Sequence, residues 1–313
     1  MSIDKVCIFG GSGFVGRHLA NLLASRKIHL RIPTRHRERA RALLVLPTAD
    51  VVQADVYDDS QLERLVSGMD AVINLIGVLH GDFHAAHVEL PRKIAAACAR
   101  NGVTRLLHMS ALHAGPDRPS QYLRSKGEGE KAVAESGLVA TVFRPSVIFG
   151  PGDASISLFA RLAGFLPVMP LGSPGARFQP VFVEDVARAF ADSLDASHTF
   201  GQSYALCGPH SYTLRRLVKY AGHITGHDPA IIGLNDSLSY LQALVLEWLP
   251  GRLMTRDNYY SMKVDNVCSP GNGNNLEAIW NIRPTALEEV APLYLAQRTP
   301  RNRYQRLRDR ARR

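Results

Sequence analysis

The first half of the chain alternates short apolar runs with longer amphipathic stretches. Strand-like runs occupy residues 5–9, 28–33, 50–54, 71–76, 104–109 and 139–143. Helical patterns lie between them, at about 14–24, 37–45, 59–67, 84–101 and 121–136. This alternation is typical of a parallel sheet with helices on both faces, whose strands are apolar throughout because both sheet faces are buried. The pattern therefore predicts an α/β fold with a doubly wound parallel sheet.

The pattern changes after Gly150. Residues 150–175 gather glycines and prolines around one apolar helical run, which indicates a loop-rich excursion from the sheet. A strand-then-helix pattern returns at 180–195, another strand candidate follows at 202–207, and helical patterns cover 213–224, 238–249 and 285–297.

Three parts are therefore predicted. Residues 1–150 with 176–207 form the sheet domain, 151–175 with 208–297 form a smaller, discontinuous C-terminal substrate-side lobe, and 298–313 form a basic tail. Within the lobe, the run 241–249 is apolar enough for a membrane or partner surface, and a buried helix is the preferred interpretation.

Composition narrows the class of protein. The chain has 313 residues and is 46% hydrophobic, which excludes a disordered or fibrous protein. No signal peptide is visible, and no apolar window approaches the ~18 residues of a transmembrane helix. The histidines of 79–87 lack the constellation of a zinc site, so no metal is expected. The cysteines, which are far apart, predict reduced thiols and a cytoplasmic location: Cys7, Cys98, Cys207 and Cys268.

The formal charge of +9 is concentrated at one end. Residues 298–313 contain eight arginines and one aspartate, which leaves the rest of the chain close to neutral. Clustered arginines are attracted to anionic bilayers. The tail therefore predicts peripheral contact with the inner face of the cell membrane or with an acidic protein partner. Nucleic acid is not favoured as a partner, because no nucleic-acid-binding fold accompanies the tail.

A glycine-rich run sits between the first strand and the first helix. Glycines at this turn allow a sharp bend and close approach to a pyrophosphate, which the helix N-terminus attracts. Spacing from Gly10 and from Gly11 fits two subtypes of the motif, and both remain open. The alternative is a tight turn that binds nothing. The run predicts a Rossmann-type dinucleotide site formed by Gly10, Gly11, Ser12, Gly13, Phe14, Val15 and Gly16.

The residues at the end of the second predicted strand indicate whether the cofactor is NAD(H) or NADP(H). An NAD site usually places an acid there, on the ribose 2′-hydroxyl, but residues 33–37 read Pro-Thr-Arg-His-Arg. Arg35 could instead bind a 2′-phosphate, so NADP(H) is favoured over NAD(H). The alternative is a solvated charge at the start of the next helix.

Three further residues predict acid–base chemistry. Ser110 ends a strand, and Tyr122 and Lys126 share a helix face because they are four residues apart. A nearby ammonium favours the phenolate, which suits Tyr122 to proton transfer, and Ser110 could hydrogen-bond a substrate oxygen.

With these motifs in this order, the chain resembles the short-chain dehydrogenase/reductase superfamily in its extended, epimerase/dehydratase branch, over nearly its whole length. The resemblance implies that Tyr122 is the acid/base, that Lys126 holds the nicotinamide ribose and lowers the Tyr122 pKa, and that Ser110 orients the substrate. An aspartate such as Asp55 would approach the adenine. Further cofactor-binding residues implied by the resemblance are Val56, Asn74, Leu75, Ile76, Gly77, Pro145, Ser146 and Val147.

Residues 251–269 look like those of an atypical subgroup, which contains the nucleotide-binding accessory subunit of mitochondrial complex I and its bacterial relatives. That subgroup is not known for vigorous catalysts. Where many relatives carry a fourth catalytic Asn, this chain has His87 within Ala-His-Val-Glu-Leu-Pro. His87 could relay protons, and a packed or solvated histidine is the preferred interpretation.

Two functions follow as hypotheses. The first is an NADP(H)-dependent oxidoreductase, or an epimerase of the nucleoside-diphosphate-sugar type, that acts on an unidentified small molecule with Tyr122 as acid/base. The second is a tightly NADP(H)-binding structural or assembly subunit of a membrane-associated respiratory or quinone-pathway complex, with little turnover.

Overall fold

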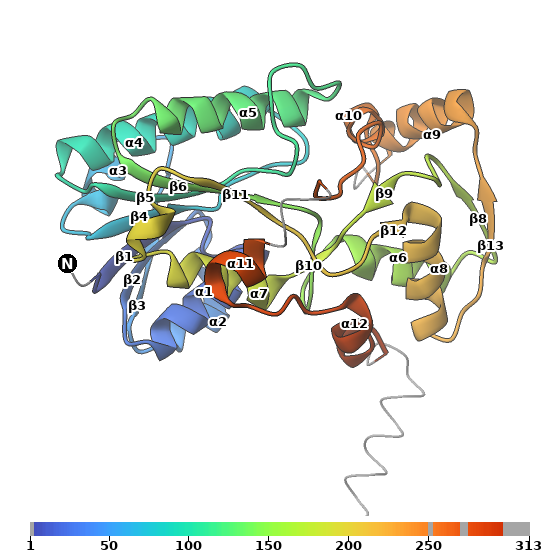
Figure 1. Cartoon of the computed structure of the whole chain (residues 1–313), viewed down its shortest axis with the longest axis horizontal. Coiled ribbons are helices and arrows are strands. Elements are labelled where there is room, and N and C mark those ends of the chain that lie inside the picture. Colours follow the sequence, from blue (N-terminus) through green and yellow to red (C-terminus); the bar gives the residue numbers. More distant parts are fainter. Residues whose placement is uncertain (1–2, 250–252, 270–274, 297–313) are drawn as a thin grey trace, which may run out of the picture. The chain divides into compact units, whose positions relative to one another are not determined.

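A computed structural model describes residues 3–249, 253–269 and 275–296 (Figure 1). The chain forms two compact units. The first comprises Met1–Pro145, Val183–Leu206 and Pro270–Arg283, and the second comprises Ser146–Phe182, Cys207–Ser269 and Pro284–Arg313. Within the described ranges, no helix combines the length and apolar character needed to cross a membrane.

The first unit is built on a seven-stranded parallel sheet. Its spatial order is β3, β2, β1, β4, β5, β6, β11. The chain reverses direction across the sheet at β1, which places the carboxyl ends of β1 and β4 at the switch point where such sheets bind ligands. The strands are β1 Lys5–Phe9, β2 His29–Thr34, β3 Ala49–Gln53, β4 Ala71–Asn74, β5 Arg105–Met109, β6 Val139–Pro145 and β11 Ser203–Leu206.

Helices cover both faces of this sheet, as Figure 1 shows. One face carries α1 (Phe14–Ser25), α2 (Arg41–Leu44) and α7 (Val183–Asp192). The other carries α3 (Asp59–Val66), α4 (Leu90–Arg100) and α5 (Gln121–Ala134). The predicted doubly wound parallel sheet is confirmed. Short helical turns connect these elements, at η1 Arg37–Ala40, η2 Ala85–Glu89 and η3 Ser197–Thr199.

Local sequence explains where these helices begin. The Asp58 carboxylate accepts hydrogen bonds from the backbone of Ser60 and Gln61, and the Ser120 hydroxyl accepts one from Leu123. Side-chain caps of this kind satisfy N–H groups that the first turn leaves unpaired.

A buried arginine ties the amino-terminal ends of β5 and β6 to the segment that follows α7. Arg105 on β5 is 4% exposed and donates to the backbone oxygens of Val139, Ser193 and Leu194. Its guanidinium also lies 4.4 Å from the centroid of the Phe200 ring. Burial lowers the Arg105 pKa to about 10, so the group remains a cation at neutral pH.

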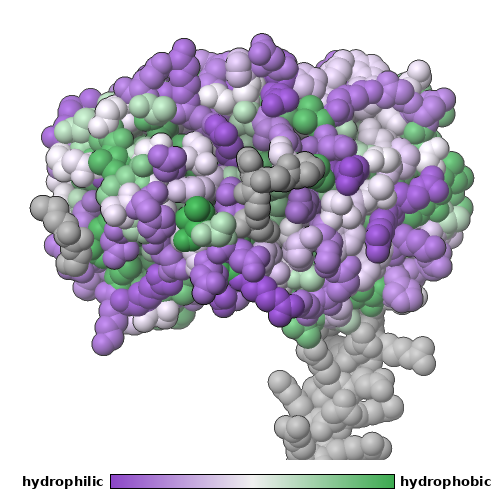
Figure 2. All heavy atoms as spheres, in the orientation of Figure 1, coloured by the Kyte–Doolittle hydropathy of each residue, from purple (hydrophilic) through white to green (hydrophobic). Residues whose placement is uncertain are grey.

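The second unit consists of helices and short two-stranded sheets. β7 (Ile148–Phe149) pairs with β10 (Val181–Phe182), β8 (Val168–Leu171) with β13 (Ala230–Gly233), and β9 (Arg177–Phe178) with β12 (Tyr212–Thr213). Its helices are α6 Ser155–Ala163, α8 Leu214–Ile224, α9 Asp236–Trp248, α10 Arg256–Ser261 and α12 Leu287–Leu295. Green side chains gather in Figure 2 at the edge that carries β8 and β13, where Val168 and Ile232 are exposed.

The limits of the units differ from the predicted ones. The first unit ends at Pro145 rather than at 150, resumes at Val183 rather than at 176, and leaves Cys207 to the second. Pro270–Arg283, assigned to the lobe from the sequence, belongs to the first unit. Its α11 (Asn275–Trp280) places Trp280 against Phe143, an aromatic contact that the local pattern could not reveal.

The prediction that the run 241–249 forms a buried helix is wrong for much of its apolar side. Leu241, Val245 and Trp248 on α9 are 52%, 53% and 84% exposed. The helix packs through Ser239 and Ala243 instead, which are buried small residues.

The prediction that all four cysteines are reduced is also wrong. Cys7 and Cys98 are buried free thiols, but Cys207 and Cys268 form a disulfide across 61 positions of sequence. Gln179 brings the two segments together, since its amide nitrogen donates to Gly208 O and its amide oxygen accepts from Cys268 N. This pairing depends on a distant side chain, so cysteine spacing alone did not reveal it.

Removing the disulfide should destabilise the protein without unfolding it. We expect Cys207→Ser with Cys268→Ser to lower the free energy of unfolding by about 3–4 kcal/mol, because a loop of this length is no longer closed in the unfolded chain. Chemical denaturation of the oxidised protein and the double variant measures the difference. Alkylation of unreduced, denatured protein should label two cysteines, Cys7 and Cys98; labelling of all four would contradict the disulfide.

Candidate active site

The turn after β1 brings the backbone close to where a ligand would lie. Gly10 has φ = 79°, a conformation that favours glycine, and its carbonyl accepts from Gly13 N at 2.9 Å. A Cβ at Gly16 would overlap the Gly10 oxygen, so the first turn of α1 packs directly on the loop. No acidic side chain occupies that first turn, which leaves the positive end of the α1 dipole open to an anion.

A cavity of about 460 Å³ lies in front of this turn. Its volume is within the range of small-molecule and cofactor sites. The walls come from the β1–α1 turn, the end of β2, the segment after β3 and the loop after β4. The lining residues are Gly10, Ser12, Gly13, Pro33, Thr34, Arg35, His36, Arg39, Ala54, Val56, Tyr57, Leu75, Ile76, Gly77 and Val78.

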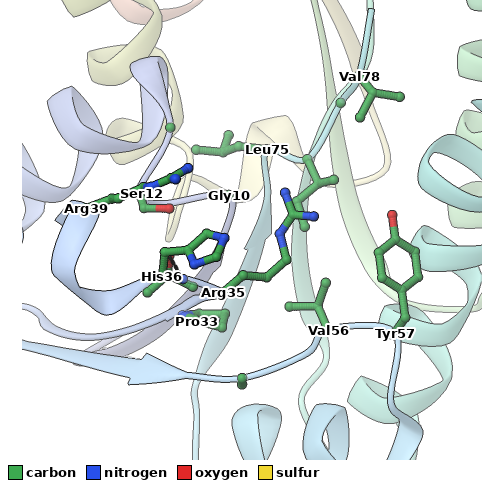
Figure 3. Close-up of a pocket in the computed structure, with 15 residues that line it drawn as sticks. Gly10, Ser12, Pro33, Arg35, His36, Arg39, Val56, Tyr57, Leu75 and Val78 are labelled. Carbon is green, nitrogen blue, oxygen red and sulfur yellow. Dashed lines mark hydrogen bonds between the residues drawn. The ribbon is translucent and has the colours of Figure 1, made fainter. Parts of the chain in front are cut away.

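Two exposed arginines give one end of the cavity its charge. Arg35 and Arg39 both line it, and neither guanidinium group forms a hydrogen bond or an ion pair with the described residues. Figure 3 shows Arg35 and Tyr57 extending into the same space, with Val56 between their backbones. This end therefore offers guanidinium groups, an aromatic face and an apolar floor, which suit a phosphate and a base ring.

The loop after β4 forms the opposite wall and is fixed at three points. Leu75 N donates to Phe9 O at 2.9 Å, Ile76 N to Asn74 Oδ1 at 3.1 Å, and Val78 N to His87 Nε2 at 2.9 Å. Asn74 and His87 are both buried and thus shape this wall from behind.

Lys126 supports the same loop from α5. Its buried ammonium donates to Met109 O at 3.1 Å and to Ile76 O at 3.4 Å. A Cβ at Gly77 would lie 3.0 Å from Lys126 Nζ, so glycine leaves room for the ammonium. Burial lowers the Lys126 pKa to about 8, and the Glu130 carboxylate opposes that shift.

His87 is a packed residue with both ring nitrogens occupied. Nε2 accepts from Val78, so in the neutral ring Nδ1 carries the proton and donates to Ser125 Oγ at 2.9 Å. Burial, with the nearby Lys126 charge, lowers the His87 pKa to about 3, which keeps the ring neutral at physiological pH. His87 is therefore a packed histidine, which agrees with the preferred interpretation of the sequence.

The local backbone explains how His87 reaches this place. Residues Ala85–Glu89 form a π-helical turn, and Pro91 follows four residues after His87. Proline has no N–H to donate to the His87 carbonyl, so the regular α-helical bond at that oxygen is absent. α5 approaches this oxygen so closely that a Cβ at Gly129 would collide with it.

Tyr122 and Ser110 lie beside this cluster. The Tyr122 ring meets the edge of His87 at a centroid distance of 5.5 Å and that of Phe83 at 6.2 Å. Ser110 is 4% exposed, and its hydroxyl has no hydrogen-bond partner among the described residues. A buried hydroxyl without a partner is costly and is a frequent feature of functional sites.

The structure divides the sequence-predicted residues into three groups. Gly10, Ser12, Gly13, Arg35, Val56, Leu75, Ile76 and Gly77 line the cavity. Gly11, Phe14, Val15, Gly16, Asp55, Asn74, Ser110, Tyr122 and Lys126 lie in the same unit but outside the lining. Pro145 ends β6, whereas Ser146 and Val147 belong to the second unit, where both hydrogen-bond Asn266.

Asp55, which the resemblance places near the adenine, is not among the residues that line the cavity. Its carboxylate accepts from Tyr57 N, and its own N–H donates to Gln61 Oε1. The carboxylate therefore bends the chain so that Val56 and Tyr57 line the cavity.

Sequence reasoning missed several lining residues. They are Pro33, Thr34, His36, Arg39, Ala54, Tyr57 and Val78. Among them, Arg39 and Tyr57 have the side chains best suited to bind a ligand, a guanidinium group and an aromatic ring. Only their proximity to Arg35 in space distinguishes them from ordinary surface residues.

The residues present fit a dinucleotide cofactor. The glycine turn leaves a cradle that Cβ atoms would fill, and the open helix end and the paired arginines supply complementary charge. Gly10, Ser12 and Gly13 would hold the pyrophosphate, Arg35 and Arg39 the ribose end, and Leu75–Val78 the central part.

Comparison with known proteins agrees with this site. A family model described as NAD(P)H-binding matches residues 10–156. The chain is 35% identical over 223 residues to NADH dehydrogenase (ubiquinone) 1 alpha subcomplex subunit 9 of Mus musculus, covering 68% of this chain and 59% of that protein. The chain thus spans less than two thirds of that relative's length.

Two bacterial relatives are named as reductases. A (4-alkanoyl-5-oxo-2,5-dihydrofuran-3-yl)methyl phosphate reductase of Streptomyces griseus is 30% identical over 71% of this chain and 74% of its own length. A ceramide reductase of Caulobacter vibrioides is 29% identical over 78% of each chain.

Solved structures show the same fold. The NADPH-dependent quinone oxidoreductase of Escherichia coli, solved with NADPH, superposes with a TM-score of 0.74 at 20% identity, covering 92% of this chain and 99% of that one. The fold and the glycine turn define a Rossmann protein with an NAD(P)H-binding domain. The chain belongs to the epimerase/dehydratase-like family of short-chain dehydrogenases/reductases.

The buried Lys126 should make stability depend on pH. The unfolded lysine titrates near 10.5 and the folded one near 8, so between these values the unfolded chain binds more protons and stability rises with pH. We expect this rise to total on the order of 3 kcal/mol in the native protein and to be missing in Lys126→Met. Urea unfolding of both proteins from pH 7.5 to 10 measures it. Parallel curves would show that Lys126 titrates normally.

Proposed function

We propose that this protein is an NADP(H)-dependent oxidoreductase that reduces a carbonyl group of a small molecule, or oxidises the corresponding alcohol. The observation that carries the proposal is the position of the α5 face that bears Tyr122 and Lys126. Lys126 on this face hydrogen-bonds the loop that lines the cofactor cavity. The reductase names of two relatives support the same reaction class.

In this proposal the nicotinamide supplies or accepts the hydride when the cofactor is bound. Tyr122 Oη gives a proton to the substrate oxygen during reduction and takes one during oxidation. The Lys126 ammonium, positively charged below about pH 8, stabilises the phenolate left behind. Ser110 Oγ, which has no described partner, is available to donate a hydrogen bond to the substrate oxygen.

Preference for NADP(H) rests on the charge at the cavity end. Two guanidinium groups lie there, and none of the described lining residues is an Asp or Glu that could accept a hydrogen bond from a ribose hydroxyl. A 2′-phosphate would be bound by Arg35, and Arg39 would add a second cation.

A second candidate function is that of an NADP(H)-binding structural subunit in a membrane-associated respiratory or quinone-pathway complex. The identity to the mitochondrial complex I subunit favours it. The extensive fixation of the cavity wall by Asn74, His87 and Lys126 would suit a cofactor that is held rather than exchanged. Either function is compatible with a cytoplasmic protein at the inner face of the cell membrane, the location we propose.

Replacing Tyr122 separates the two functions. We expect Tyr122→Phe to lower kcat by about 10²–10⁴-fold, because proton transfer is lost, while the Kd for NADPH stays within about twofold. NADPH oxidation over a panel of carbonyls and quinones gives kcat, and fluorescence titration gives Kd. Tyr260→Phe, at an exposed tyrosine of the second unit, is the control. Cofactor that co-purifies and is never oxidised by any compound of the panel would support the structural function instead.

Reversing the charge at Arg35 tests the cofactor preference. We expect Arg35→Asp to weaken NADPH binding about 10–100-fold and to leave NADH binding equal or better, because a charge-assisted bond to the 2′-phosphate is lost. Arg37→Asp makes the same charge change two residues away, outside the cavity lining, and should alter the ratio little. Equal shifts in the two variants would refute the role of Arg35.

A further inference from the structure

One side of α9 is an apolar stripe on the surface of the second unit. Its members are 47–84% exposed, and Trp248 is the most exposed large hydrophobic residue of the described chain. At 100° per residue, they fall within about 100° of the helix circumference. The α9 stripe consists of Leu238, Leu241, Val245, Trp248 and Leu249.

The rest of α9 is anchored to its own unit. Gln242, beside the stripe, donates to Pro170 O and accepts from Gly172 N, and the Ser239 hydroxyl accepts from Ser173 N. The two carboxylates of the helix, Asp236 and Glu247, are ion-paired with Lys263 and Arg256. By helical spacing both acids lie on the side of α9 that faces away from the stripe. No carboxylate of this helix would therefore repel an anionic surface that the stripe contacts.

The size of the stripe argues against a stable protein interface. Such interfaces usually bury about 800 Å² and about 20–30 residues on each partner, whereas the α9 stripe has five residues in a single row. A row of leucines ending in tryptophan is typical of helices that enter the boundary between lipid headgroups and acyl chains.

The positive charge of the C-terminal residues indicates that the lipid is anionic. The described chain reaches Ala296 after α12, and residues 298–313 contain eight arginines against one aspartate. Sixteen residues span up to about 50 Å when extended, which exceeds the diameter of roughly 36 Å that corresponds to the radius of gyration of roughly 14 Å expected for a unit of this size. The length of the tail is therefore sufficient to reach a membrane that α9 contacts.

We propose that the α9 stripe inserts into the headgroup region of an anionic lipid bilayer, and that residues 298–313 strengthen this docking through their arginines. Insertion of apolar side chains and attraction of cations are two separate contributions, and stable membrane attachment commonly needs two. This docking is independent of the proposed reaction, since no residue of the α9 stripe lines the cofactor cavity.

Trp248 provides a direct readout. The chain has two tryptophans, so Trp280→Phe leaves Trp248 as the single emitter. Adding phosphatidylcholine vesicles that contain phosphatidylglycerol should move its emission to shorter wavelength, with a smaller change for vesicles of phosphatidylcholine alone. Emission that stays unchanged while the full chain co-sediments with vesicles would overturn insertion of the α9 stripe.

Variants separate the two contributions. We expect Leu241→Ser with Val245→Ser to lower the affinity of the full chain for anionic vesicles about tenfold or more. Truncation after Gln297 should remove most of the dependence on phosphatidylglycerol. Val45→Ser, at a 79% exposed residue of the first unit, is the matched control and should bind as the native chain does. Thermal unfolding verifies that each variant is folded.

Two results would overturn the proposal. One is vesicle binding by the double-serine variant that equals that of the native chain. The other is Trp248 emission that is already at short wavelength without vesicles and moves to longer wavelength on dilution, since a second copy of the chain would then cover the stripe.

Discussion

The site depends on the close approach of α5 to residues 85–90. Glycine at 129 lets the helix backbone reach the His87 carbonyl, and proline at 91 leaves that carbonyl without its usual helical donor. A larger residue at 129 would push α5 outward, and both Tyr122 and Lys126 would move with it. The backbone contact between Gly129 and His87 thus helps to set the position of Tyr122 and Lys126.

This contact also links the two halves of the site. Val78 is held by His87, and Ile76 by Lys126, so the wall of the cavity is fixed both to His87 and to α5. The neutral His87 ring is suited to this task because one nitrogen accepts while the other donates. His87 therefore has a structural role that does not require it to titrate.

Much of the fold could be predicted from sequence because the strands are buried on both faces and are read as apolar runs. The glycine turn, Arg35 and the Tyr122–Lys126 pair were recognisable because their chemistry depends on local spacing. Arg39 and Tyr57 were not, because they reach the cavity only through the pairing of β2 with β3. The same limit applies to Trp280, which returns to the first unit from far along the chain, and to the exposed side of α9, where an apolar run in sequence does not reveal whether tertiary packing covers it.

Gln179 holds the two segments of the disulfide together independently of the sulfur–sulfur bond. Its amide holds the segments of both cysteines through hydrogen bonds to Gly208 and Cys268, which do not involve sulfur. After reduction, the two thiols would therefore remain neighbours at a high effective concentration, and the bond would re-form within one molecule in preference to cross-linking two.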